Sequence, residues 1–112
     1  MESKTALAAL SALAQETRLA IFRRLVKAGP KGETAGMIAA TLGIPAPTLS
    51  FHLKELEHAG LIGQRRESRN LIYAAQFGAM RSLLDFLMQD CCGGHPEICE
   101  LVSEKPSANT CC

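Results

Sequence analysis

The chain has 112 residues, a length typical of one domain with a modest core. Its formal net charge of +1 excludes a polycation that coats nucleic acid non-specifically, although local basic patches remain possible. The apolar stretch near the N-terminus is too short for a membrane span and resembles no signal peptide, so we expect a cytoplasmic protein without membrane contact. In that compartment the five cysteines stay reduced, which favours metal or redox chemistry over a disulfide framework.

Apolar residues at helical spacing predict two helices in the first thirty residues. The first covers about residues 4–14 and carries three leucines and several alanines. The second begins at Gln15-Glu16-Thr17, and Gly29-Pro30 ends it. Its buried stripe is expected to consist of residues spaced three and four positions apart, namely Leu19, Phe22, Leu25 and Val26.

Two further helices are predicted around a tight glycine-containing turn. Residues 31–33 are expected to form a polar turn, and Thr34 suits the N-cap of a third helix, which Gly43 interrupts. Pro45-Ala46-Pro47 then opens a fourth helix, since proline is tolerated in a first turn, and Gly60 closes it. The fourth helix is apolar along one edge only, at the positions Leu49, Leu53 and Leu56.

The remaining sequence predicts a hairpin, a last helix and a tail. Two strand-like runs, residues 61–66 and 71–74, flank a polar loop and predict a β-hairpin. Residues 77–90 form a strongly amphipathic helical pattern. We therefore expect a mainly α protein with a small β-hairpin, a winged helix-turn-helix of five helices and a two-stranded wing, over residues 1–90. Residues 91–112 are expected to be a flexible, cysteine-containing tail.

The fourth helix and the hairpin together indicate binding to double-stranded DNA. In a winged helix-turn-helix the second helix of the motif enters the major groove, and its N-terminal residues approach base edges. Hydroxyl, imidazole and aromatic groups there can contact bases, whereas lysine and arginine suit phosphates. Any one of these side chains alone could be a cap or solvated surface, so the prediction depends on their combination. The predicted DNA-contacting residues are Thr48, Ser50, Phe51, His52, Lys54, Arg65, Arg66 and Arg69.

Three segments resemble the ArsR/SmtB family of metal-responsive bacterial repressors, over about residues 5–90. They are Ala14-Gln15-Glu16-Thr17-Arg18-Leu19, the run from Leu49 to Ile62, and Arg65-Arg66 with Tyr73. The resemblance implies a repressor that binds operator DNA, that has no enzymatic activity, and that forms a homodimer through its first and last helices. One departure is Ser68 in the wing turn, where the family usually has glycine.

The cysteines after the last helix predict a site for a soft ion. Cys91 and Cys92 are adjacent, and Gly93-Gly94 permits a sharp reversal that could return Cys99 to them. Three thiolates suit trivalent arsenic or antimony, and a subgroup of arsenic-responsive members of the resembled family carries a similar arrangement. We therefore predict arsenite, As(III), or antimonite as the inducer, bound by Cys91, Cys92 and Cys99 and releasing the repressor from its operator.

Several alternatives remain open for these thiols. Zinc or cadmium could be held by the same three cysteines with His95, because mixed Cys/His sets of four are normal for tetrahedral zinc. Cys92 and Cys99 could instead form a redox pair in a repressor of the same fold. Cys111 and Cys112 are given no role. A rival from another class is a thiol-based metalloid chaperone; a thiol enzyme has no nucleophile–base arrangement to support it.

Overall fold

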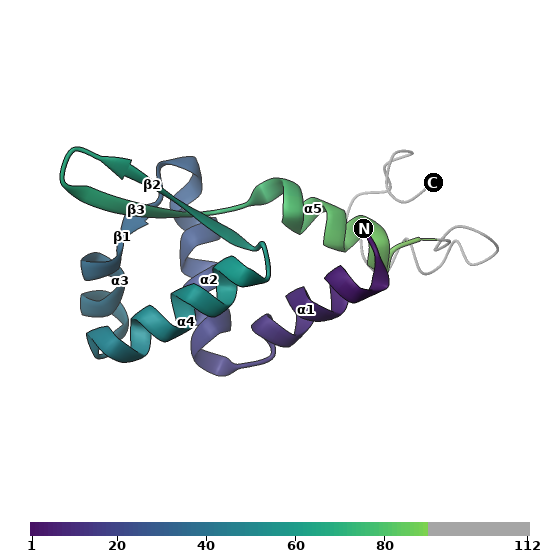
Figure 1. Cartoon of the computed structure of the whole chain (residues 1–112), viewed down its shortest axis with the longest axis horizontal. Helices are drawn as coiled ribbons and strands as arrows, with labels where there is room; N and C mark the ends of the chain where they lie inside the picture. Colours follow the sequence, from purple (N-terminus) through teal and green to yellow (C-terminus); the bar gives the residue numbers. More distant parts are fainter. Residues whose placement is uncertain (90–112) are drawn as a thin grey trace.

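The computed structural model describes residues 1–89, and the predicted tail at 91–112 lies outside them. In this part of the chain the elements follow in the order α1, α2, a 3-10 turn η1, β1, α3, α4, β2, β3 and α5 (Figure 1). Their bounds are α1 Ser3–Leu13, α2 Glu16–Ala28, η1 Gly29–Lys31, β1 Glu33–Thr34, α3 Ala35–Leu42, α4 Ala46–His58, β2 Ile62–Glu67, β3 Asn70–Ala75 and α5 Phe77–Leu87. The predicted five-helix winged helix-turn-helix is thus confirmed.

Local capping explains where α2 and α3 begin and why α3 ends. The Gln15 side chain accepts a hydrogen bond from the backbone N–H of Arg18 at 2.8 Å, and the Thr34 hydroxyl accepts one from Met37 at 3.2 Å. Both bonds satisfy backbone donors that the first helical turn leaves unpaired. Gly43 follows α3 with a φ of +66°, a left-handed conformation that glycine adopts without strain. This turn directs the chain from α3 into α4.

The wing is an antiparallel hairpin that a third, short strand joins. β2 and β3 pair from Ile62↔Ala75 to Glu67↔Asn70, which leaves a two-residue loop. β1 pairs with the other edge of β3, so the strand order is β1-β3-β2. The predicted polar turn at 31–33 was therefore wrong at Glu33, which lies in β1. The chain comes so close to β3 here that a β-carbon on Gly32 would overlap the carbonyl oxygen of Tyr73.

The core lies where α2 crosses the helix-turn-helix pair, with α2 in the middle of the molecule (Figure 1). Its most completely buried large side chains are Ile21, Leu25, Ile38, Leu53, Leu56 and Leu61. One member of the predicted stripe of α2 is wrong, because Leu19 is 42% exposed. Phe22 and Leu25 are buried as predicted, together with Ile21, which was not in the predicted stripe. Leu19 lies at a surface groove next to α5.

Helices α1 and α5 lie together at one end of the molecule (Figure 1). Both helices leave leucine side chains exposed. α1 packs inward through small residues, Ala6, Ala9 and Ala12, whereas Leu7 and Leu10 are exposed. α5 ends at Leu87, three residues before the predicted end, and of its residues Leu83 alone is buried. None of the helices in residues 1–89 is long and apolar enough to cross a membrane.

Candidate nucleic-acid interface

Helix α4 has one buried edge and one exposed edge, as the sequence predicts. Leu49, Leu53 and Leu56 are each at most 2% exposed and anchor the helix to the core. The opposite edge carries Thr48, Ser50, Phe51 and Lys54, all of which are exposed. An aromatic ring that is 56% exposed, as that of Phe51 is, is unusual for a large apolar side chain on a helix that packs well. This edge is free to meet a ligand; that the ligand is DNA stays a prediction for these residues.

His52 is the exception, because this predicted DNA-contacting residue does not lie on the exposed edge. It is 8% exposed and lies on the buried edge, one turn after Leu49 and one turn before Leu56. Its Nδ1 is 3.2 Å from the Nη1 of Arg18. A guanidinium only donates, so Nδ1 must accept and the ring proton must lie on Nε2. Burial lowers the pKa of His52, and the Arg18 charge lowers it further, while Glu55 partly opposes the shift. The ring is therefore a neutral packing group, and the position does not suit base readout.

Arg18 links three helices and was missed as a functional residue by the sequence analysis. Its Nε donates a 2.7 Å hydrogen bond to the carbonyl oxygen of Ala12, near the end of α1, and its Nη1 donates to His52 in α4. Carbonyls in the last turn of a helix lack partners within that helix, and a cation there also complements the helix dipole. The local signal for this role was weak, because the partner in α4 is 34 residues away.

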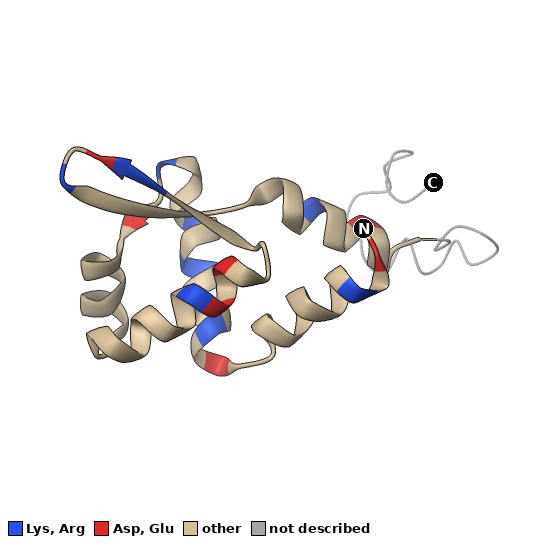
Figure 2. Cartoon of the chain, in the orientation of Figure 1, with Lys and Arg blue, Asp and Glu red and all other residues tan. Residues whose placement is uncertain are grey.

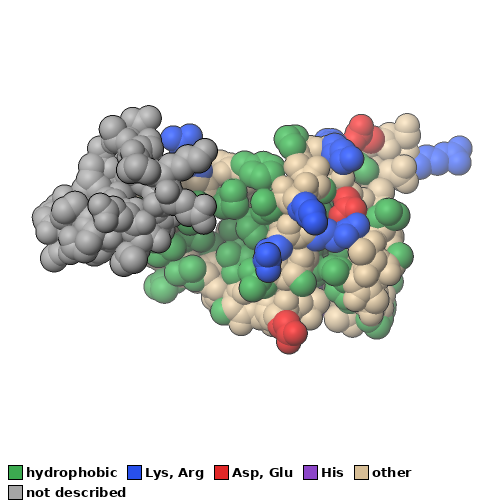
Figure 3. Space-filling view, turned by 180° about the vertical axis from the view of Figure 1, so that it is seen from behind, with side chains coloured by type: hydrophobic (Ala, Val, Ile, Leu, Met, Phe, Trp, Pro, Cys, Tyr) green, Lys and Arg blue, Asp and Glu red, His purple; other side chains and the backbone are tan. Residues whose placement is uncertain are grey.

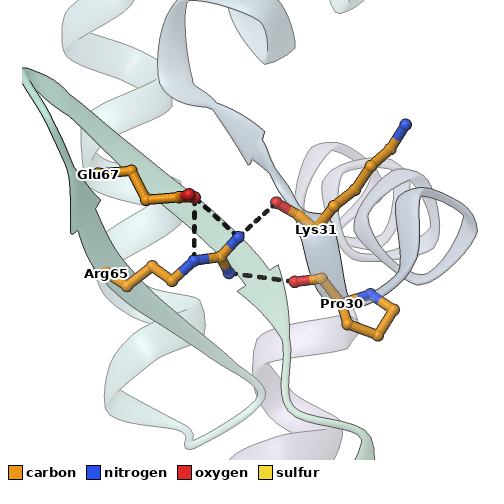
Figure 4. Close-up of polar contacts among 4 residues, drawn as sticks. All are labelled: Pro30, Lys31, Arg65 and Glu67. Atoms are coloured by element: carbon orange, nitrogen blue, oxygen red, sulfur yellow. Dashed lines mark hydrogen bonds and ion pairs between the residues drawn. The ribbon is translucent and has the colours of Figure 1, made fainter.

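The wing presents its arginines in two different ways. Arg66 and Arg69 are exposed, and no hydrogen bond or ion pair engages either side chain within residues 1–89. Figure 2 shows basic positions at the tip of the hairpin. Arg65 instead turns back to the protein body. It donates from Nη1 to the carbonyl of Pro30 at 3.0 Å, from Nη2 to that of Lys31 at 2.8 Å, and from Nε to Glu67 at 3.1 Å (Figure 4). Of the predicted wing contacts, Arg66 and Arg69 are thus the two with uncommitted charge.

The wing turn consists of Ser68 and Arg69, as the register of the hairpin requires. Ser68 has a φ of +57°, and no other non-glycine residue between 1 and 89 has a positive φ. A two-residue hairpin loop whose first residue has a positive φ normally favours glycine there. Ser68, which stands where the resembled family usually has glycine, is therefore the one residue of the wing with a strained backbone conformation.

The predicted metal ligands Cys91, Cys92 and Cys99, with His95, lie outside the described residues. Within residues 1–89 no three His, Cys, Asp or Glu side chains gather closely enough to hold a metal ion. The binding of arsenite, antimonite or another soft ion therefore stays a prediction that depends on the sequence of the tail.

Comparison with known proteins agrees with this arrangement. Residues 13–65, from the end of α1 into β2, match a family model described as a helix-turn-helix domain. Over 58 residues the chain is 41% identical to YceK of Bacillus subtilis, an HTH-type transcriptional regulator; the match covers 52% of this chain and 57% of YceK. The chain thus spans little more than half the length of this curated relative.

Two solved structures extend the likeness over most of the chain. The transcriptional regulator HlyU of Vibrio vulnificus is 32% identical, with a TM-score of 0.58, and the match covers 76% of this chain and 88% of HlyU. The homodimeric winged helix-turn-helix DNA-binding domain of Mb0332 from Mycobacterium bovis, a possible ArsR-family regulator, is 26% identical with a TM-score of 0.63. That match covers 84% of this chain and 83% of the domain. Together with the one-sided α4 and the wing, these likenesses show that the chain belongs to the ArsR family of winged helix-turn-helix transcriptional regulators.

Proposed function

We propose that the protein is a homodimeric repressor that holds operator DNA through α4 and the wing and is released by arsenite. The observation that carries the DNA-binding part is the exposed edge of α4, where Phe51 and Lys54 project opposite a fully buried leucine edge. Thr48, Ser50 and Phe51 lie in the N-terminal half of the helix, which approaches bases in this motif. Lys54, Arg66 and Arg69 supply the charges for phosphates.

A second copy of the chain would cover the apolar surface at the other end of the molecule. Leu7 and Leu10 of α1, and Leu84 and Leu87 of α5, are between 38% and 65% exposed. Beside them lies an apolar groove of about 710 Å³ between α2 and α5, lined by Leu13, Leu19, Phe22, Met80, Leu83 and Leu84. Figure 3 shows hydrophobic side chains across the middle of this face, next to several Lys and Arg side chains. Such a patch normally marks an association surface, and the Mb0332 domain is a homodimer.

The inducer is proposed from the donor set of the tail. Cys91, Cys92 and Cys99 offer three thiolates, which match the three-coordinate preference of As(III) and of antimonite. Only three residues separate Cys91 from the end of α5 at Leu87, and α5 is one of the two proposed dimer helices. Closing three sulfurs around an ion would therefore constrain the end of that helix. Two half-sites require recognition helices about 34 Å apart, so a small rotation of the copies would remove contacts on one side.

Fluorescence anisotropy on the protein's own promoter DNA tests both halves of the proposal. Wild-type protein should bind with a log Kd that rises with log salt with a slope of about +5, from three phosphate-contacting cations in each of two copies. Sub-millimolar arsenite should release the DNA from wild type and from a Cys111→Ser/Cys112→Ser control, but not from Cys91→Ser, Cys92→Ser or Cys99→Ser. Absence of promoter binding without arsenite would contradict the repressor and leave the metalloid chaperone.

Parallel titrations separate the alternative inducers. Release by zinc or cadmium but not by arsenite would favour the four-ligand site with His95, and His95→Ala would then abolish the response. Release by an oxidant, reversed by dithiothreitol, would favour the redox pair. For any inducer the coupling must be reciprocal: DNA must weaken inducer binding by the same factor by which the inducer weakens DNA binding. Equal arsenite affinity with and without DNA would contradict the allosteric mechanism.

A further inference from the structure

Arg65 fastens the wing to the body of the protein. The residue lies on β2, but its guanidinium passes beside β3 to the two carbonyl oxygens of η1, Pro30 and Lys31 (Figure 4). Glu67, two residues further along the same strand, accepts from Nε at 3.1 Å and lies 3.0 Å from Nη2. Side chains two apart project from the same face of a strand, which explains why the Glu67 carboxylate lies beside the Arg65 guanidinium. Three of the five guanidinium donors are thus committed inside the protein.

Arg66 provides an internal comparison because it is the next residue on the same strand. Its side chain projects from the opposite face, is exposed and has no partner within residues 1–89. The carboxylate of Glu67 further offsets the charge of Arg65, whereas no acidic group is paired with Arg66 in this part of the chain. A phosphate would therefore meet an available cation at Arg66, and a cation already paired and hydrogen-bonded at Arg65.

The other attachments of the hairpin run through β3, which packs on α2, β1 and η1, and through the first residues of β2, which pack on α4. Of β2 only Ile62 is buried, and from Gln64 to Glu67 the strand is exposed. β1 pairs with β3 at two residues and makes no pairing with β2. An isolated two-stranded ribbon is marginally stable in water, so its outer half needs a link to the body. The side chain of Arg65 supplies that link from the outer half of β2, whose residues from Gln64 to Glu67 are exposed.

We propose that Arg65 is a positioning residue for DNA binding: it holds the wing at a fixed angle so that Arg66 and Arg69 meet the phosphates, and does not itself contact them. The role depends on the fork of the guanidinium, which reaches two carbonyls and one carboxylate at once. A lysine has the same charge but no such fork. This inference rests on the proposed contact of the wing with DNA, and its first test is independent of DNA.

Amide hydrogen exchange of the full-length free protein supplies that test. Arg65→Ala and Arg65→Lys should both accelerate exchange in residues 62–75 by about tenfold, because alanine has no donor and lysine has no fork that reaches both carbonyls and the carboxylate at once. Arg66→Ala and Arg66→Lys are the matched controls and should leave exchange at the wild-type rate. Exchange in α2 and α4 should be unchanged in all four variants, which excludes global destabilisation. Unchanged exchange in the hairpin of both Arg65 variants would overturn the proposal.

DNA affinity as a function of salt supplies the second readout. Arg65→Lys should bind about three- to tenfold more weakly with an unchanged salt slope, since the charge remains but the wing is loosened. Arg66→Lys should stay near wild type, and Arg66→Ala should reduce the slope by about 2 per dimer. Two results would show instead that Arg65 contacts the phosphates. One is a wild-type DNA affinity of Arg65→Lys. The other is an equal loss of salt slope in Arg65→Ala and Arg66→Ala, with amide exchange at the wild-type rate. If neither Arg66 variant changes DNA affinity while both Arg65 variants accelerate exchange, the proposed contact of the wing with DNA is refuted. The conclusion that Arg65 holds the wing in place is then retained.

Discussion

Replacing Arg18 with methionine should destabilise the fold by about 2–4 kcal/mol. The structure gives Arg18 two hydrogen bonds between helices, to the Ala12 carbonyl at 2.7 Å and to His52 Nδ1 at 3.2 Å. Hydrogen bonds that involve a charged group contribute about 1.5–3 kcal/mol each, and partial exposure of both places them at the lower end of that range. Methionine retains much of the apolar stem of arginine, so the loss should reflect the polar contacts.

Urea unfolding followed by circular dichroism measures this effect. With an m-value of about 1.5 kcal/mol/M, the midpoint should fall by about 1.5–2.5 M without a change in m. All variants must be compared at one protein concentration, because the proposed dimerisation would couple apparent stability to concentration. Lys54→Met is the control on an exposed position of α4 and should remain within about 0.5 kcal/mol of wild type.

A double-mutant cycle with His52→Met assigns the loss to its partners. The Arg18–His52 contact should appear as a coupling of about 1 kcal/mol, and the remainder belongs to the end of α1. If Arg18→Met changes the free energy of unfolding by no more than the Lys54→Met control, the connection between α1 and α4 does not contribute to stability and the reasoning is refuted.

Three further predictions concern the same elements. Because burial lowers the pKa of His52 below its ordinary value of 6.5, the unfolded chain takes up the proton first; stability from the neutral ring is complete above pH 6.5 and is lost as the pH falls through the folded pKa. Urea midpoints at pH 7 and pH 5 should therefore differ less in His52→Gln than in wild type. Ser68→Gly should raise stability by up to about 1 kcal/mol, since relief of a left-handed serine exceeds the added entropy of the unfolded chain; a lower midpoint would contradict the strained turn. Phe51→Ala should weaken promoter binding at least about tenfold while its free energy of unfolding stays within about 0.5 kcal/mol of wild type; a parallel loss of binding and stability would mean that the ring belongs to the core.

Most of the helical framework could be predicted because its boundaries are local. Gly29-Pro30, the left-handed Gly43 and the capping hydroxyl of Thr34 act within a few residues, and each lies where the structure places an element end. The exposed edge of α4 was predictable for the same reason, since a leucine spacing of four and three fixes the opposite edge.

What could not be predicted depends on partners distant in sequence. A histidine three residues after Leu49 lies at the border of the buried edge, and only the arrival of Arg18 from α2 decides that it turns inward. The two-residue strand β1 has no periodicity of its own and exists because β3 passes beside it. In α1 three alanines are buried and two leucines are exposed, which is the reverse of what hydrophobicity alone favours within a single chain.

The direct succession of β1 and α3 limits how this protein can change shape. Thr34 is at once the last residue of β1 and the N-cap of α3, so the sheet and the first helix of the motif share a residue with no spacer between them. A tilt of the sheet would therefore also move α3, and α4 would move with α3 because only the short Gly43 turn separates them. Each protomer of the proposed dimer would then move as a rigid body. Adaptation to operators with a different half-site spacing would then depend on the interface between the two protomers. Substitutions that weaken packing at this interface should let the protein bind a wider range of half-site spacings.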